Sequence, residues 1–364
     1  MTLRIGIVGC GDVATRHYLP GIRGAATLAS VVALADPREG AAEAVAASIA
    51  DWSPGAAPYR AVEAMLGDQR LDGVFNLTPA PLHGAVNEVI LDNGVALFSE
   101  KPIAGGLPAA DALIALAKER GVLFQAATAS AVTGRMRWLR DLAASGTLGK
   151  PTLAVAHHAD PGPAAWREYT GDPTPFYREG VGPLFDHGVY RLHEMTTVLG
   201  PIARVQAMGS IALPQRRILG GPKAGQSIEV NTPDHILVQL EFASGALGQL
   251  LASFAAHDTL APWLEIQFER GAVSFGGKSW ERDAPVQIFE TDPAGEGHGW
   301  RTATEAPTDE VGTVEAGARH FIRCLAGLEE SVLTAEHARH VLEVMLLTYA
   351  SIDEGRAKET RTTF

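Results

Sequence analysis

Three small residues near the start of the chain follow the apolar run LRIGIV: Gly9, Gly11 and Ala14. When G-x-G-x-x-A lies between a strand and a helix, the first glycine makes a tight turn, the second lets the backbone approach a pyrophosphate, and the alanine lets helix and strand pack closely. The unpaired N–H groups of the helix start, around Asp12 and Val13, favour phosphate. The pattern therefore predicts a strand, a turn and a helix that bind a dinucleotide.

The second apolar run, SVVALA from Ser30, ends at Asp36. A carboxylate at this distance from the glycine turn can accept hydrogen bonds from the ribose hydroxyls of a dinucleotide. Its charge repels a 2′-phosphate and favours NAD, whereas Arg38 can attract that phosphate, so NADP remains the alternative. The plainer interpretation is that the glycines end a strand and Asp36 begins a turn at Pro37, which leaves the strand and helix context of the motif unexplained.

Residues 1–127 alternate short apolar runs with Ala-rich helical stretches, a rhythm typical of a parallel sheet with helical crossovers. The helical stretch PAADALIALAKERG has an early proline and closes on Gly121, as helices prefer. Six strands in this rhythm predict a doubly wound Rossmann domain of the α/β class that binds NAD(P). The predicted strands are LRIGIV from Leu3, SVVALA from Ser30, a short strand near Tyr59, LDGVFNLT from Leu71, VALFSE from Val95 and VLFQAA from Val122.

Residues 128–364 change to longer alternating runs joined by tight turns. A Ser-Gly pair at 244–245 and an Arg-Gly pair at 270–271 each separate two strand patterns, which predicts hairpins. We expect an α+β domain for substrate binding and oligomerisation, with a large, mostly antiparallel open sheet. The C-terminal helices, at about 312–354, are expected to pack back on the body, with Thr334 as an N-cap.

The chain has a formal net charge of -12 and no run of Lys and Arg. Such a charge repels phosphate backbones and anionic lipids, so small molecules are the expected partners, and nucleic acid and membranes are not. The segment MTLRIGIVGCGD lacks the basic flank and long apolar core of a signal peptide, so a cytoplasmic protein is expected. Cys10 and Cys324 lie far apart in the sequence, and we expect both to be reduced and structural.

Glu100, Lys101 and Pro102 follow the fifth predicted strand, at the edge where open α/β sheets bind ligands. Taken alone, Lys101 is more simply a solvated surface charge, since most lysines are. At this edge a lysine can also handle a proton beside a nicotinamide.

The stretch GPLFDHGVYRLHEM, residues 182–195, is dense in titratable side chains. On an α-helix Asp186, Tyr190 and His193 are spaced i, i+4 and i+7, so they share one stripe and can face one pocket. His187 points about 100° away from Asp186, so one metal ion cannot readily collect both His187 and His193, and no metal is expected. The plain alternative is a capped helix start with solvated side chains.

The segments before this stretch leave alternatives open. His157 and His158 end a strand pattern and point to opposite faces, so at most one of them faces the pocket. Trp166 and Tyr177 belong to a group of aromatic residues in the Pro- and Gly-rich stretch 161–183, where such side chains either stack on a sugar ring or pin the loop.

Four motifs together, G-x-G-x-x-A at 9–14, NLTPAPLH at 76–83, EKP at 100–102 and GPLFDHGVYRLH at 182–193, resemble the Gfo/Idh/MocA oxidoreductase family in order and spacing. The resemblance covers nearly the whole chain. It implies a Rossmann domain, a second domain with a large open sheet, and homodimers or homotetramers formed through that sheet. It also implies NAD(P)-dependent hydride transfer at a carbinol carbon of a sugar, cyclitol or related polyol.

The resemblance also implies roles for single residues. The Lys of E-K-P is usually catalytic, which assigns that role to Lys101 and places Glu100 at the cofactor site. Thr78, Pro79 and His83 are implied contacts of the nicotinamide or its ribose. Without the resemblance, His83 would be interpreted as a helix residue turned to solvent.

This chain departs from the family pattern D-x-G-x-H-x-x-D, because Tyr190 stands where the pattern has His and His193 stands where it has the final Asp. A free tyrosine has a pKa of about 10, and a nearby ammonium such as that of Lys101 favours its phenolate form. We expect Tyr190 to exchange the substrate proton, Lys101 to polarise the substrate oxygen, and His193 and Asp186 to orient the substrate or relay the proton. An NAD-dependent glycosidase and a non-catalytic dinucleotide-binding regulator share the fold and are the alternatives.

Overall fold

The computed structural model describes residues 2–291 and 299–364, and its internal contacts divide the chain into two compact units. The first unit comprises Met1–Thr133, Val311–Leu342 and Phe364, and the second comprises Gly134–Glu310 and Glu343–Thr363. The division therefore falls after Thr133 rather than after residue 127, and it assigns part of the C-terminal helical region to the first unit.

The first unit contains a six-stranded sheet whose neighbouring strands are all parallel, in the order β3-β2-β1-β4-β5-β6. Its central strands are buried over nearly their whole length, because helices cover a parallel sheet on both faces. The doubly wound fold predicted from the apolar runs is confirmed. The strands are β1 (Leu3–Val8), β2 (Ala29–Ala35), β3 (Ala57–Tyr59), β4 (Gly73–Asn76), β5 (Ala96–Ser99) and β6 (Phe124–Ala126).

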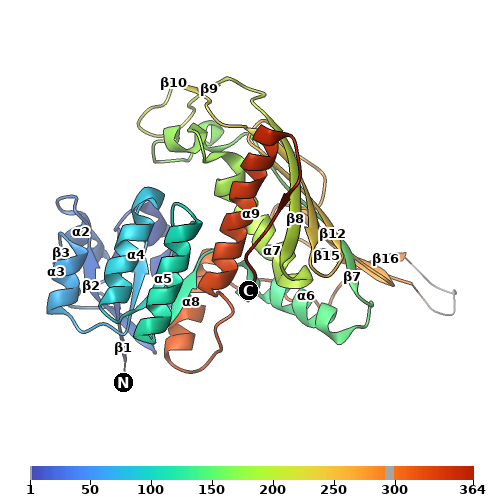
Figure 1. Cartoon of the computed structure of the whole chain (residues 1–364). Coiled ribbons are helices and arrows are strands. Elements are labelled where there is room, and N and C mark those ends of the chain that lie inside the picture. Colours follow the sequence, from blue (N-terminus) through green and yellow to red (C-terminus); the bar gives the residue numbers. More distant parts are fainter. Residues whose placement is uncertain (1, 292–298) are drawn as a thin grey trace. The chain divides into compact units, whose positions relative to one another are not determined.

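Helices α4 and α5 pack side by side in the first unit (Figure 1). α5 begins with a proline in its first turn and ends at Gly121 in the left-handed conformation, as predicted. The helices of this unit are α1 (Leu19–Arg23), α2 (Ala41–Ser48), α3 (Val62–Asp68), α4 (His83–Asp92), α5 (Leu107–Arg120) and α8 (Thr313–Leu325).

Helix α8 is part of the core of the first unit, although it lies far along the chain. Phe321 is fully buried, and its ring centroid lies 5.1 Å from that of Phe75 and 5.8 Å from that of Phe98. The helix packs against α1, where a side chain larger than hydrogen at Gly21 would meet the backbone of Glu315 at 2.8 Å. The sequence-based prediction assigned this helix to the second domain. A hydrophobic pattern shows that a helix has an apolar face, but it does not show which core that face packs against.

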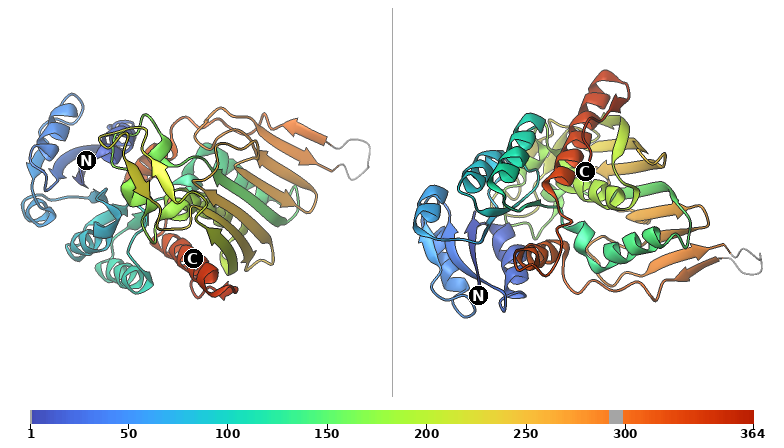
Figure 2. Two further views of the ribbon diagram at one scale, coloured as in Figure 1. Left: turned by 90° about the horizontal axis from the view of Figure 1, so that it is seen from above. Right: turned by 60° about the horizontal axis from the view of Figure 1, so that its bottom comes forward.

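The second unit contains a nine-stranded sheet in the order β16-β15-β14-β13-β7-β12-β11-β8-β17, fanned out in Figure 2. Among these strands only β7 and β12 pair in parallel, so the expected mostly antiparallel sheet is confirmed. Both predicted hairpins form, one between β11 and β12 and one between β13 and β14. The strands are β7 (Pro151–Ala159), β8 (Ile202–Ser210), β11 (His235–Phe242), β12 (Leu247–Ser253), β13 (Leu264–Phe268), β14 (Gly271–Phe275), β15 (Val286–Glu290), β16 (Gly299–Thr302) and β17 (Lys358–Glu359).

One face of this sheet is covered and the other is open. Helix α7 packs on β7 and β12 and contacts α6 beside it. On the open face Met208, Leu237 and Leu247 are 76%, 44% and 55% exposed, while the alternate residues of their strands are mostly buried. The remaining elements are α6 (Gly134–Ser145), α7 (Val189–Leu199), α9 (Ala335–Glu354), β9 (Gln215–Arg217) and β10 (Ser227–Glu229).

Residues 161–183 form short turns that pack on the second unit. Tyr177 is 1% exposed and joins a small apolar cluster with Phe254 and Ile218. The hydroxyl of Tyr177 accepts a hydrogen bond from the backbone N–H of Ala164 at 3.1 Å. Of the two interpretations of the loop aromatics, Tyr177 follows the structural one. None of the helices in the described ranges combines the length and the apolar character needed to cross a membrane.

Candidate functional site

The glycine turn of the first unit leaves the end of β1. Gly9 has φ +93°, and a Cβ there would lie 2.6 Å from the carbonyl oxygen of Leu77, so only glycine fits. A Cβ at Gly11 would meet nothing within 4 Å, so the backbone there borders open space. Ala14, the first residue of the helical turn, is 1% exposed and belongs to the core of the unit. The three positions have the local geometry that the dinucleotide motif requires.

The helix after the glycine turn is not a regular α-helix. Its residues Ala14–Tyr18 form a π-helical turn before α1. Pro20 lies just beyond this widened turn and has no N–H to donate to a carbonyl one turn earlier. At the start of the helix, Asp12 forms an ion pair with Arg16 at 2.7 Å, and Val13 is 42% exposed.

The Asp36 carboxylate is buried and held on both oxygens. Oδ2 accepts hydrogen bonds from the backbone N–H of Cys10 at 2.9 Å and from the Arg38 guanidinium at 2.7 Å, and Oδ1 accepts two more from Arg38. Burial opposes ionisation, but these hydrogen bonds outweigh it and lower the pKa of Asp36 to about 2. Asp36 is therefore an anion at neutral pH, and most of the Arg38 side chain is exposed to water beside it.

Buried amides tie together the loops that follow β4 and β5. Asn76 accepts hydrogen bonds from the backbone N–H and the hydroxyl of Thr78, and it donates to Asn87 at 2.7 Å. Asn87 in turn donates to the Ser99 hydroxyl and to the carbonyl of Ile103, both at 2.9 Å. Since every one of these groups is buried or half-buried, the network fixes the two loops against each other.

His83 does not turn to solvent, because it is 2% exposed. Its ring nitrogens lie 2.7 Å from the carbonyl oxygens of Pro102 and Thr78. The ring thus bridges the segment around Pro79 and the E-K-P segment, so it positions both. The implied direct contact of His83 with a cofactor stays a prediction.

Glu100 orients the loop that carries Lys101. Its Oε1 accepts a hydrogen bond from the Tyr18 hydroxyl at 2.7 Å, and its Oε2 accepts one from the backbone N–H of Lys101 at 3.0 Å. Lys101 is half-buried. Because Tyr18 belongs to the π-turn after the glycines, the carboxylate connects the glycine turn directly to the E-K-P segment.

The titratable stretch of the second unit begins with another π-turn. Residues Leu184–Gly188 form this turn, and α7 starts only at Val189. The expectation of one continuous α-helix through Asp186, Tyr190 and His193 is therefore wrong, because the wider turn rotates Asp186 relative to the other two.

The members of this stretch differ in burial. Tyr190 is half-buried and His193 is 5% exposed. Asp186 Oδ2 lies 3.5 Å from Nδ1 of His187. Arg191 and Glu194 form a buried ion pair at 3.1 Å, with the Arg191 guanidinium 4.5 Å from the centroid of the Trp263 ring, so this pair is structural.

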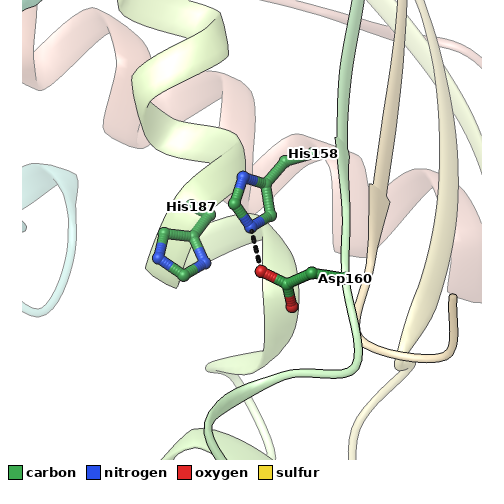
Figure 3. A group of neighbouring side chains, drawn as sticks. All are labelled: His158, Asp160 and His187. Carbon is green, nitrogen blue, oxygen red and sulfur yellow. Dashed lines mark hydrogen bonds and ion pairs between the residues drawn. The ribbon is translucent and has the colours of Figure 1, made fainter. Parts of the chain in front are cut away.

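His187, set aside on helical spacing, lies beside two residues from the end of β7 (Figure 3). Its ring stacks on that of His158 with centroids 3.9 Å apart, and Nε2 of His158 lies 3.0 Å from Oδ2 of Asp160. His157 takes the opposite face, where its Nδ1 lies 3.0 Å from the carbonyl oxygen of Pro262. The predicted opposite orientation of the two neighbouring histidines is confirmed.

The predicted residues thus fall into two groups. The first unit brings together the glycine turn, Asp36 and the E-K-P segment, and the second unit carries Asp186, Tyr190 and His193. Sequence reasoning missed Tyr18, Asn87 and Asp160. The H-x-D spacing of His158 and Asp160 on one strand face was a visible signal for the last of these.

Comparison with known proteins finds two family models that cover most of the chain. Residues 3–128 match the oxidoreductase family with an NAD-binding Rossmann fold, and residues 136–274 match the GFO/IDH/MocA C-terminal domain. A levoglucosan dehydrogenase in complex with NADH has the same fold, with a TM-score of 0.82 at 17% identity over 100% of both chains.

Curated relatives share the sequence at a moderate level. A dTDP-3,4-didehydro-2,6-dideoxy-alpha-D-glucose 3-reductase from Actinomadura kijaniata is 28% identical over 59% of this chain, and the match spans only 60% of the relative's own length. A 1,5-anhydro-D-fructose reductase from Ensifer adhaerens is 29% identical over 99% of both chains. Together with the two family models, which match both units in the expected order, these findings show that the chain belongs to the Gfo/Idh/MocA oxidoreductase family.

Proposed function

We propose that the chain is an NAD(P)-dependent oxidoreductase that transfers a hydride between the nicotinamide and a carbinol carbon of a sugar, cyclitol or related polyol, with NAD preferred. The names of the relatives support the substrate class, since they act on a dTDP-sugar and on an anhydro-sugar. The ionised Asp36 supports the preference for NAD, because its charge repels a 2′-phosphate.

One observation carries the proposal: the carboxyl ends of β1, β2, β4 and β5 are joined by side-chain hydrogen bonds into a single edge. Asp36 accepts a hydrogen bond from the backbone N–H of Cys10 in the glycine turn, and Glu100 accepts one from Tyr18 in the helical turn that follows the glycines. Ligands of open α/β sheets bind at such an edge. Lys101 stands on this edge, beside the expected place of the nicotinamide.

The proposed chemistry divides the work between the side chains. The bound nicotinamide supplies or accepts the hydride. Lys101 donates a hydrogen bond to the substrate oxygen and stabilises negative charge on it, while Tyr190 takes up or returns the proton of that oxygen. His193 and Asp186 orient the substrate or relay the proton.

The experiment is a screen for the absorbance change of NADH and NADPH across polyols, sugars and sugar acids. On the best substrate, we expect Lys101→Ala and Tyr190→Phe each to lower kcat by a factor of about 100 or more, since a positioned acid/base group contributes about 10²–10⁴-fold. Lys150→Ala, at an exposed lysine before β7, is the control outside the proposed site, and Tyr59→Phe removes only a hydroxyl that is hydrogen-bonded to Asp68 and Gln69. Turnover unchanged in both site variants, or no binding of either cofactor in calorimetry, would refute the proposal.

The protein is further proposed to act as a cytoplasmic homodimer or homotetramer. Met208, Leu237 and Leu247 expose apolar side chains on the open face of the nine-stranded sheet, and such a surface is suited to bury itself against a second copy. Light scattering after size exclusion tests this. Leu237→Lys is expected to shift the mass toward that of one chain, and a wild-type protein that already elutes as a monomer would contradict the proposal.

A further inference from the structure

Two imidazoles and one carboxylate meet where β7 ends in the second unit. His158, Asp160 and His187 each present one donor atom, and these three atoms lie within 4.8 Å of one another. His158 is 7% and Asp160 8% exposed, while His187 is half-buried. Figure 3 shows the His187 ring facing the pair formed by His158 and Asp160.

The backbone places these three side chains together from two elements. His158 and Asp160 are two positions apart at the end of β7, so both point to the same face of the sheet. The chain continues to pair with β12 one residue beyond the end of β7, because the N–H of Asp160 donates a hydrogen bond to the carbonyl of Ser253 at 3.1 Å. The π-turn Leu184–Gly188 packs against β7 and β12 and brings His187 across that face.

The Asp160 carboxylate is fixed in direction. Its Oδ1 accepts a hydrogen bond from the backbone N–H of Gly162 at 2.7 Å, which leaves Oδ2 turned toward the histidines. A carboxylate oxygen and two imidazole nitrogens therefore face one another, and these are donor types that coordinate transition-metal ions.

The surroundings limit the access of water. The His187 ring lies 5.6 Å from the ring of Trp166 and 6.2 Å from that of Phe254, measured between centroids, and Phe254 is fully buried. Asp186 adds a second carboxylate 3.5 Å from Nδ1 of His187. A compact cation beside two imidazoles would therefore meet negative charge in surroundings that screen it weakly.

We propose that His158, Asp160 and His187 form a binding site for one divalent transition-metal ion. Imidazole nitrogens and a carboxylate suit Zn²⁺, Fe²⁺ and Mn²⁺, whereas Mg²⁺ and Ca²⁺ prefer oxygen donors throughout. Three protein ligands leave at least one coordination position for water or for an oxygen of a small molecule. The site stands on residues of the second unit alone, and it does not depend on the proposed hydride transfer.

The test measures metal binding directly. Protein freed of its affinity tag and dialysed against a chelator is titrated with Zn²⁺ and with Co²⁺, by calorimetry and by the visible absorption of bound Co²⁺. The wild type is expected to bind one ion per chain. His158→Gln and Asp160→Asn are expected to weaken that binding at least tenfold, while His157→Gln, the control on the opposite face of β7, binds as the wild type does.

Two results would overturn the proposal. One is a wild-type protein that binds no ion stoichiometrically, in which case the three residues form only a hydrogen-bonded cluster. The other is unchanged affinity in His158→Gln and Asp160→Asn. Circular dichroism and thermal melting check that each variant is folded like the wild type, because the three ligands belong to the second unit, and the wild-type stoichiometry needs no variant at all.

Discussion

Acid should destabilise the first unit through one buried histidine, His337, in the first turn of α9. The side chain is 5% exposed, and its ring stacks on that of Phe364 with centroids 4.0 Å apart. Burial lowers the pKa of His337 to about 3, and the charge of His340 opposes protonation further. His337 therefore stays neutral in the folded chain at pH values where it is protonated in the unfolded chain, that is, below pH ~6.5.

The sign and size of the effect follow from proton linkage. Between pH ~6.5 and the folded pKa, the unfolded state binds more protons, so stability falls as pH falls. At pH 5, about 1.5 units below the unfolded pKa, His337 costs the folded state about 2 kcal/mol, since each unit is worth about 1.4 kcal/mol. Above pH ~7 the cost vanishes.

The assay is urea unfolding at pH 7.5 and pH 5.0 for the wild type and for His337→Gln, which is neutral at both values. Glutamine loses the ring stacking, but that loss is the same at both pH values and cancels in the difference. The loss of unfolding free energy between pH 7.5 and 5.0 is expected to be about 2 kcal/mol smaller in His337→Gln. His17→Gln, at an exposed histidine of the same unit, serves as the control and should behave as the wild type does. Equal losses in the wild type and His337→Gln would refute the reasoning.

Two further predictions concern the cofactor edge of the first unit. Asp36→Asn removes the charge that repels a 2′-phosphate and frees the Arg38 guanidinium. The ratio of NADP affinity to NAD affinity should therefore rise about 10- to 100-fold, which is the effect of a unit charge a few ångströms away at partial screening. Calorimetry with both cofactors measures this ratio, and an unchanged ratio would contradict the prediction. Gly9→Ala forces a Cβ to 2.6 Å from the carbonyl oxygen of Leu77 at a residue with φ +93°. We therefore expect the free energy of unfolding to fall by about 1–3 kcal/mol and NAD binding to be lost. Gly67→Ala, where a Cβ meets nothing within 4 Å in a helix, is its control, and equal melting temperatures of the two variants would count against the close approach.

Much of the fold could be predicted because its elements leave local marks in the sequence. Buried parallel strands read as continuous apolar runs, and β1 and β2 were located almost to the residue. The Ser-Gly pair at 244–245 marked a hairpin because glycine adopts the positive φ that such turns need. The Thr334 cap could also be predicted, and its hydroxyl accepts a hydrogen bond from the N–H of His337 at 3.2 Å.

The contacts between distant segments could not be predicted in the same way. Helix α8 joins the first unit through Phe321, which no periodicity assigns to one core rather than another. Asn87 is one polar residue on a helix until α4 is placed against the loops after β4 and β5. His158 and Asp160 share a strand face, but only the packed turn across that face supplies His187.

The two π-turns show most clearly why contacts between distant segments could not be predicted from the sequence. Each adds width to a helix directly after the chain enters it, and each carries a side chain to a polar cluster: Tyr18 to the Glu100 carboxylate, and His187 to the ring of His158. On a regular α-helix the direction of every later side chain would change, so Tyr18 and His187 would leave these contacts. A helical wheel assumes the regular repeat, so it set His187 about 100° away from Asp186, whereas in the folded chain Oδ2 of Asp186 lies 3.5 Å from Nδ1 of His187. Single widened turns occur often at functional positions in proteins, so the turn at Leu184–Gly188 supports the second unit's cluster as a site rather than as packing.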